Sequence, residues 1–346
     1  GVTPSLGYNP DDGFKVGVGL NYTVKGFSRN PYSQQHRFKS GYFFATSGFS
    51  LNYDGEFANL FGEWNLHVAG QLTSENFTNN FFGYGNETVN NDDDLDLDYN
   101  RIKTSIYAAS VGVLKKGDFG SDYGIKITTE AVEIGETPDR FIETQESSAT
   151  TTDFYNRRFF AGLEGNFNYH SFDNAINPSR GMTFDLGVGG KTEVKNSKYT
   201  YGFVNTALGF YNALSTNRKL VLKTDARAQM RFGDDLIFYQ AANIGGANGL
   251  RGYRLQRFTG QNSVTGSADI RYSFNQFKTK TLPLQLGVFV GGDVGRVWTK
   301  NDDSRIWHND YGVGFWVTAA DSVSGTFNFF NSEEGLRFSF GFGLNF

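Results

Sequence analysis

Apolar and polar residues alternate one by one along much of this chain. The C-terminal segment shows the pattern most clearly, with one set of alternate positions apolar: Leu336, Phe338, Phe340, Phe342, Leu344 and Phe346. The positions between them are polar or small: Arg337, Ser339, Gly341, Gly343 and Asn345. Because successive side chains of a β-strand point to opposite faces, this alternation predicts a strand with one apolar face and one polar face.

The same alternation recurs throughout the sequence and predicts an all-β fold. Sixteen segments can be placed, at residues 2–9, 13–24, 36–46, 48–58, 62–74, 99–114, 122–134, 156–171, 180–193, 198–212, 217–231, 263–274, 284–296, 311–319, 322–330 and 335–346. No linker or low-complexity stretch interrupts them, so we expect residues 1–346 to form a single domain.

Two architectures share this pattern, and the alternation alone does not choose between them. In a soluble sandwich the apolar faces point inward, whereas in a membrane barrel they point outward and the charged residues line the lumen. Most of the strands span about 10 to 14 residues, a length that suits a tilted crossing of the bilayer. The sequence therefore predicts a 16-stranded antiparallel transmembrane β-barrel.

The lengths of the connections support this assignment. If the C-terminus faces the periplasm, the long connections 75–98, 135–155, 232–262 and 297–310 all fall at the outer end. Long external loops and short periplasmic turns are typical of such barrels. The connection 25–35 is an exception, a longer inner turn. The longest of these connections, 232–262 between strands 11 and 12, is a candidate functional segment, because long ordered loops in compact β proteins are usually functional.

Composition narrows the class of partners and sites. The 346 residues include 43 Gly and 35 Phe, and no run approaches the roughly 20 apolar residues of a membrane helix. A net charge of −4 gives no basic footprint for nucleic acid, so we expect no nucleic-acid partner. The chain has no cysteine, which excludes disulfides and thiolate metal sites.

Nothing else in the sequence predicts a metal or a cofactor. Four histidines lack ligand spacing: His36, His67, His170 and His308. The acidic run at residues 92–98 could bind Ca²⁺, but it lacks the glycine and glutamate of an EF-hand loop. We favour a solvated loop tip for this run. We expect neither a catalytic residue nor a nucleophile elbow, since no G-x-S-x-G occurs.

One arginine stands out in the longest connection. Residues 244–253 read I-G-G-A-N-G-L-R-G-Y and place Arg251 in a glycine-rich stretch. In the strand at 284–296, alternation points Asp293 into the lumen, where the flanking Gly292 and Gly295 would let another backbone come close. Arginine can bind a carboxylate with a planar pair of donors.

Four sequence features together carry a family resemblance. The first is the loop motif of Gly245, Gly246, Leu250, Arg251, Gly252 and Tyr253; the second is a turn containing Asp173, Pro178 and Gly181; the third is the motif Gly292, Asp293 and Gly295; the fourth is the terminal Phe346. The chain resembles the bacterial surface-antigen superfamily of outer-membrane assembly factors, which includes Bam-type, Tam-type and two-partner-secretion barrels. The resemblance implies that the segment 232–262 between strands 11 and 12, the family's loop six, folds inward and that its Arg251 pairs with Asp293 in the lumen. It also implies that Phe346 ends a C-terminal assembly signal.

The resemblance also implies a function. It suggests an integral barrel of a Gram-negative outer membrane that inserts or translocates other polypeptides, with a weak seam between the first and last strands. Pro4 in the first strand donates no ladder bond. A client strand could pair there by β-augmentation, without enzymatic chemistry. Expected partners are outer-membrane lipids, client polypeptides, accessory lipoproteins and upstream POTRA modules.

Two other functions stay open from the sequence. The barrel could anchor or export an upstream soluble domain of hydrolase type, or it could be a passive diffusion porin. The start of the chain carries no export signal, so we expect an upstream periplasmic or soluble domain that is absent here. The Arg251–Asp293 pair could also serve only as a tether for its loop.

Overall fold

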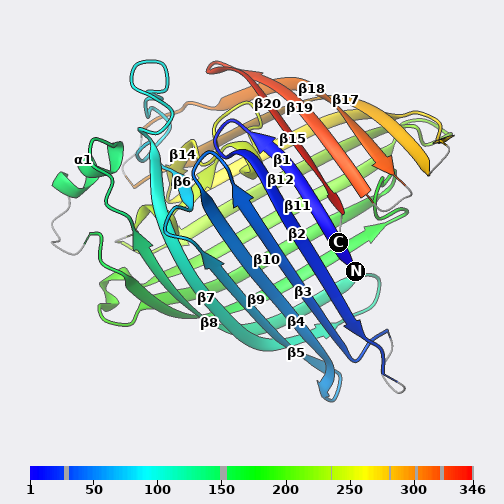
Figure 1. Ribbon diagram of the computed structural model, residues 1–346, viewed down its shortest axis with the longest axis horizontal. Helices are drawn as coiled ribbons and strands as arrows, with labels where there is room; N and C mark the ends of the chain where they lie inside the picture. Colours follow the sequence, from blue (N-terminus) through cyan, green and yellow to red (C-terminus); the bar gives the residue numbers. More distant parts are fainter. Residues whose placement is uncertain are drawn as a thin grey trace.

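Sixteen long strands close into an antiparallel barrel, the number that the alternation predicts (Figure 1). The computed structural model describes residues 1–26, 31–148, 154–234, 236–279, 282–300, 303–319 and 323–344. The barrel strands are β1 (Val2–Asn9), β2 (Gly13–Val24), β3 (Gln34–Phe43), β4 (Gly48–Phe61), β5 (Trp64–Thr73), β7 (Arg101–Lys116), β8 (Ser121–Ile134), β9 (Arg158–Phe172), β10 (Gly181–Glu193), β11 (Tyr201–Ala213), β12 (Leu220–Phe232), β15 (Asn262–Ser273), β17 (Pro283–Trp298), β18 (His308–Ala319), β19 (Val323–Ser332) and β20 (Gly335–Leu344).

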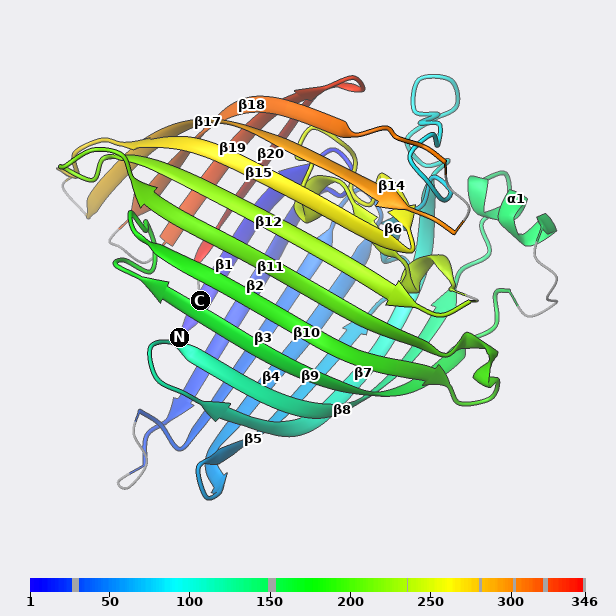
Figure 2. The same ribbon diagram turned by 180° about the vertical axis from the view of Figure 1, so that it is seen from behind.

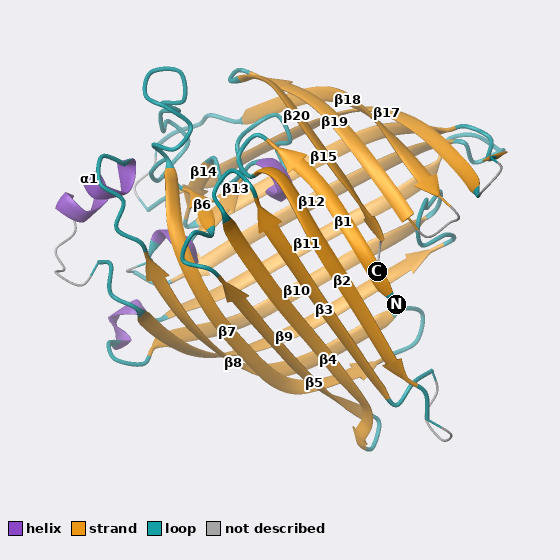
Figure 3. Ribbon diagram, in the orientation of Figure 1, coloured by secondary structure: helices purple, strands orange, loops and turns teal. Residues whose placement is uncertain are grey.

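Several short elements lie in the connections and were not predicted from the sequence. They are β6 (Thr78–Asn80), α1 (Phe141–Ser148), β13 (Ala242–Ile244), β14 (Phe258–Gly260), β16 (Phe277–Lys278) and the 3-10 turns η1 (Ser197–Tyr199), η2 (Phe238–Gln240) and η3 (Gly246–Asn248). A strand of two or three residues is too short to show a period, and these strands form because a partner pairs with them, as β13 does with β14. Figure 3 shows α1 outside the barrel wall.

The helix α1 is held by one fully buried side chain. Ile142 lies in a buried cluster with Phe81, Ile102, Ile134 and Phe238, and so joins α1 to the ends of β7 and β8 and to two loop segments. In the part of the chain that the structure describes, no helix is both long and apolar enough to cross a membrane.

The barrel exposes its apolar face and buries its charged face. On β2, the side chains of Phe14 and Val18 are 55% and 42% exposed. On β15 and β17, Asp269 and Asp293 are only 7% and 5% exposed. A soluble sandwich has its apolar side chains inside and its charges outside, whereas here the arrangement is inverted, as in a barrel whose outer face meets lipid. The prediction of a transmembrane barrel is confirmed.

The long connections gather at one end of the barrel, which we call the outer end (Figure 2). By strand parity, the tight β1–β2 and β19–β20 turns also lie at that end. The connection between β12 and β15 is named loop six here; it carries η2, β13, η3 and β14.

The barrel closes where β1 meets β20, and this ladder is short. Within the described residues, which end at Leu344, the two strands are in register over three residue pairs, Leu6–Phe342, Gly7–Gly341 and Tyr8–Phe340. By comparison, β1 pairs with β2 over eight residues and β19 with β20 over ten. We call the β1–β20 junction the seam.

Candidate functional site

Arg251 of loop six binds the carboxylate of Asp293 on the lumenal face of β17. Its Nη2 and Nε donate to Oδ1 and Oδ2 of Asp293 at 2.7 and 2.9 Å. The backbone N–H of Arg251 also donates to Oδ2 of Asp293, at 2.8 Å. The structure therefore brings together the two residues that the family resemblance pairs, and it fixes both the side chain and the backbone of Arg251.

A second carboxylate, which the sequence analysis did not assign to the site, completes the binding of Arg251. Nη1 and Nη2 donate to Oδ2 and Oδ1 of Asp269 on β15, at 3.1 and 2.7 Å. Asp269 falls on the polar face of its alternating strand, next to the strand of Asp293. That shared inward face was the signal available in the sequence, but the contact itself depends on the register between β15 and β17.

The ring of Phe330 lies over one face of the guanidinium. The Cζ atom of Arg251 lies 4.0 Å from the ring centroid of Phe330, close enough for a cation–π contact. Burial disfavours the charge on Arg251, but hydrogen bonds to Asp293 and Asp269 outweigh it and raise the pKa of the guanidinium. Two carboxylates and one ring thus fix the position of a permanent cation in the lumen.

Gly252 fits because a side chain there would collide with the wall. Its N–H donates to Oδ2 of Asp310 at 2.9 Å, and its carbonyl accepts from Oγ of Ser332 at 2.8 Å. A Cβ at position 252 would lie 2.7 Å from Cβ of Asp310, inside van der Waals contact. The loop backbone therefore touches β18 and β19 directly at this residue.

The other residues of the loop motif shape and pack the loop. Leu250 and Tyr253 are almost fully buried in a cluster with Ile244, Phe258 and Val297. Gly245 and Gly246 have φ angles of +126° and +56°, which favour glycine. Their N–H groups donate to the carbonyls of Gly249 and Leu250, closing a tight turn.

The glycines beside Asp293 differ in what they approach. A Cβ at Gly295 would lie 2.9 Å from Cγ2 of Thr265 and 3.2 Å from Cδ1 of Ile244 in loop six. A Cβ at Gly292 would lie 3.0 Å from the carbonyl oxygen of Asp310 on the next strand. Loop six therefore comes close to the wall at Gly295, whereas Gly292 faces only the neighbouring strand.

The motif with Asp173, Pro178 and Gly181 forms the turn between β9 and β10, at the opposite end from loop six. Asp173 accepts hydrogen bonds from the N–H groups of Ser179 and Arg180 at 2.8 and 3.0 Å. Pro178 is buried, and Gly181 has a φ of +149° at the start of β10. In the same turn, Asn177 donates to Oγ of Ser273 at the end of β15, at 3.0 Å. Phe346, the remaining motif residue, lies outside the described residues.

The acidic run 92–98 is partly engaged in ion pairs. Asp92, whose side chain is 21% exposed, is not the solvated residue that the sequence predicts, whereas Asp98 is 51% exposed. Asp92 binds the guanidinium of Arg254, and Asp98 binds Arg101. Within the described ranges, no group of three or more potential ligands is placed to hold a metal ion.

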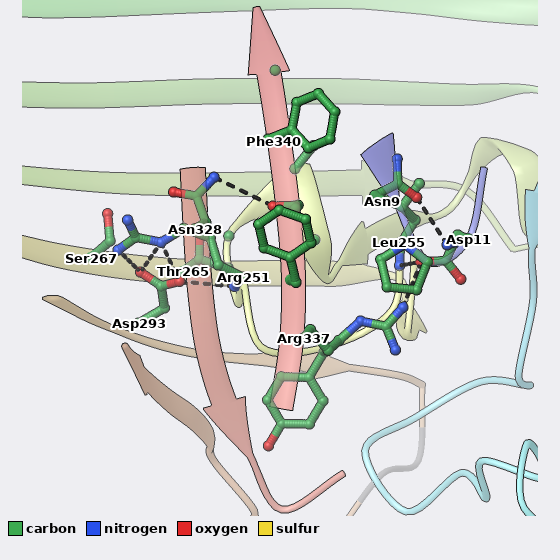
Figure 4. Close-up of a pocket in the computed structure, with 18 of the residues that line it drawn as sticks. Asn9, Asp11, Arg251, Leu255, Thr265, Ser267, Asp293, Asn328, Arg337 and Phe340 are labelled. Atoms are coloured by element: carbon green, nitrogen blue, oxygen red, sulfur yellow. Dashed lines mark hydrogen bonds and ion pairs between the residues drawn. The ribbon is translucent and has the colours of Figure 1, made fainter. Parts of the chain in front are cut away.

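A cavity of about 380 Å³ lies between loop six and the seam (Figure 4). Arg251 and Asp293 line one side of it, and Asp11, Arg337 and Phe340 line the other. The seam and the anchored loop therefore share one lumenal space.

Solved structures show the same fold at low sequence identity. BamA from Haemophilus ducreyi lacking POTRA domains 1–3 matches with a TM-score of 0.70 and 15% identity, over 100% of this chain and 70% of that one. CdiB from Escherichia coli matches with a TM-score of 0.65 and 12% identity, over 100% of this chain and 63% of that one. CdiB from Acinetobacter baumannii gives 0.59 and 11%, over 99% and 59%.

Sequence comparison gives the family. No curated protein matches the chain. The family model of the Omp85 superfamily domain matches residues 65–346, which is more than half of the sequence. This segment contains the loop-six arginine, its two carboxylate partners and the turn of Asp173. The chain belongs to the Omp85 superfamily.

Proposed function

We propose that this chain is the barrel of an outer-membrane insertase or translocase, which assists the assembly or secretion of other polypeptides by strand pairing at the seam. The observation that carries the proposal is the short closing ladder, which has three residue pairs in the part of β1 and β20 that the structure describes. Pro4 lies in β1 and has no N–H to donate. A client strand could replace the few bonds between β1 and β20 with bonds of its own, so that opening leaves few backbone groups unpaired.

The anchoring of loop six supports a closed lumen rather than an open pore. Arg251 and Gly252 bind inward-facing side chains of β15, β17 and β18, so the loop backbone lies against the lumenal wall. A diffusion porin needs a continuous aqueous channel. We therefore favour the translocase over the porin and assign loop six the role of a plug.

Client polypeptides, outer-membrane lipids, accessory lipoproteins and periplasmic POTRA modules are the partners that belong to this proposal. The BamA structure from Haemophilus ducreyi is one that lacks POTRA domains 1–3, and this chain spans 70% of that chain and 63% of CdiB from Escherichia coli. The proposed reaction is an exchange of hydrogen bonds between strands, and it needs no cofactor.

A reversible cross-link across the seam tests the proposal. The chain has no native cysteine, so Leu6→Cys with Phe342→Cys places one pair at directly opposed positions of β1 and β20. Opposed residues of antiparallel strands lie close enough for a disulfide. Phe167→Cys with Leu186→Cys gives a matched pair between β9 and β10.

The readout is the insertion of a barrel client into liposomes that contain the full-length protein. We expect the oxidised seam variant to lose insertion and to regain it on reduction, while the β9–β10 variant stays active in both states. Full activity with the seam cross-linked would refute strand pairing at this junction.

A further inference from the structure

One buried carboxylate joins the first hairpin to loop six and to the last strand. Asp11 lies in the β1–β2 turn and is 4% exposed. It accepts hydrogen bonds from Nε of Arg254 at 2.6 Å and from the N–H of Leu255 at 3.0 Å, both in loop six. It also accepts from Nη2 of Arg337 on β20, at 3.1 Å. Asp11 is thus bound at the same time from across the seam and from loop six.

Loop six also binds the β19–β20 hairpin, which lies on the other side of the seam. Nε of Arg257 donates to Oε1 of Glu334 in the β19–β20 turn at 2.5 Å, and Arg257 is 4% exposed. The hydroxyl of Tyr253 donates to Glu333 in the same turn, at 3.3 Å. Four of the five consecutive residues 253–257 therefore bind the hairpins on both sides of the seam, all except Gln256.

The charges of this cluster depend on one another because the cluster is buried. Arg254 is fully buried and binds Asp11 and Asp92, while Arg337 binds Asp11 from the other strand. The positive charges of the two arginines are balanced by the negative charges of the two aspartates. Loss of one member leaves a charge uncompensated in a place that water reaches poorly, which is strongly destabilising for the arrangement.

We propose that Asp11, Arg254 and Arg337 form a latch that couples loop six to the seam, so that the outer end of the seam separates only when loop six leaves its seat. The inference rests on the proposed function, in which the seam opens for a client strand. The three latch residues are separate from the Arg251 site, because Arg251 attaches loop six to β15 and β17 and not to the seam. They are positioning residues.

Hydrogen exchange of the purified full-length protein in lipid nanodiscs tests the latch without any client. Asp11→Asn removes the charge and keeps the shape. We expect the amides of Val2–Asn9 and of loop six at 252–257 to exchange at least about tenfold faster together, because local opening sets the exchange rate. The control is Asp12→Asn, the neighbouring carboxylate, which bonds Asn9 within its own turn; we expect it to behave as the parent. The exchange rates of amides in β9 and β10 show whether the rest of the barrel is unchanged.

A second variant separates coupling from a local structural effect. Arg251→Ala frees the loop at its opposite attachment, and coupling requires that the β1 amides then exchange faster as well. If β1 loosens in Asp11→Asn while loop six stays protected, or if Arg251→Ala leaves β1 as in the parent, the latch is refuted. Should Asp11→Asn fail to form a barrel, Arg337→Gln tests the same contact from β20 with the same expected result. A protein whose exchange couples as expected but which inserts no client would overturn the proposed function alone.

Discussion

Gly291 and Asp269 lie opposite each other on β17 and β15, and the carboxylate of Asp269 fills the space that a side chain at position 291 would need. A Cβ at Gly291 would lie 1.9 Å from Oδ1 of Asp269. That same oxygen accepts a hydrogen bond from Nη2 of Arg251 at 2.7 Å. The absence of a side chain on one strand therefore sets the position of a carboxylate that binds loop six.

Gly291→Ala should displace Asp269 and weaken the seat of Arg251. Overpacking of this kind costs about 1–3 kcal/mol. We expect the barrel still to fold and loop six to be cleaved faster by proteases, because the contact between Asp269 and Arg251 is weakened. Gly187→Ala is a suitable control, because a Cβ there meets nothing within 4 Å. Equal protease resistance of loop six in both variants would show that Asp269 can move without releasing Arg251.

Arg251→Ala should release loop six and impair client insertion while leaving a folded barrel. The substitution leaves Asp269 and Asp293 without their shared cation, and breaking a buried pair in this way costs about 3–5 kcal/mol. Arg251→Lys keeps the charge but cannot offer paired donors to two carboxylates, so we expect an intermediate loss. The measurements are proteolysis of the loop and client insertion. A fully active Arg251→Ala protein with a protease-resistant loop would refute the plug.

The turn of Asp173 should depend on pH. Burial opposes its ionisation, but hydrogen bonds from Ser179 and Arg180 outweigh this and hold the pKa of Asp173 below its ordinary value of 3.8. A group whose pKa is lower in the folded state stabilises it fully above the unfolded pKa, and that contribution is lost as pH falls through the folded pKa.

We therefore expect the Ser179 and Arg180 amides to keep constant protection factors from pH 7 to about pH 5 and to lose protection below about pH 3.8. In Asp173→Asn the charged form does not exist, so protection at pH 7 should already be lower and should no longer change with acidification. Hydrogen exchange corrected for the intrinsic pH dependence measures both. An unchanged acid transition in the Asn variant would assign it to another group.

Ion conductance should distinguish the plugged barrel from a porin. In planar bilayers we expect the parent protein to show low conductance and Arg251→Ala to show longer or larger openings, because the loop then leaves the lumen more often. The Asp12→Asn variant serves as a control with an intact site. A large and steady conductance in the parent protein would favour the diffusion porin over the translocase.

The sequence by itself determined the strands, their number and the faces that they present. The alternation of Phe14 and Val18 with their small or charged neighbours is local, because neighbouring side chains of a strand must point to opposite faces. The family motifs likewise marked Arg251 and Asp293, although the pairing came from resemblance. The short strand β6 and the helix α1 were not predicted from the sequence, because each is too short to show a period of apolar residues.

Only the tertiary structure decided which charges meet. Asp269 became a partner of Arg251 through the register of β15 on β17, and Asp11 meets Arg254 and Arg337 although more than half of the chain separates them. The number of residue pairs at the seam also depends on how the first strand meets the last. Such contacts follow from strand register and from the path of loop six across the lumen, and no spacing between nearby residues carries that information.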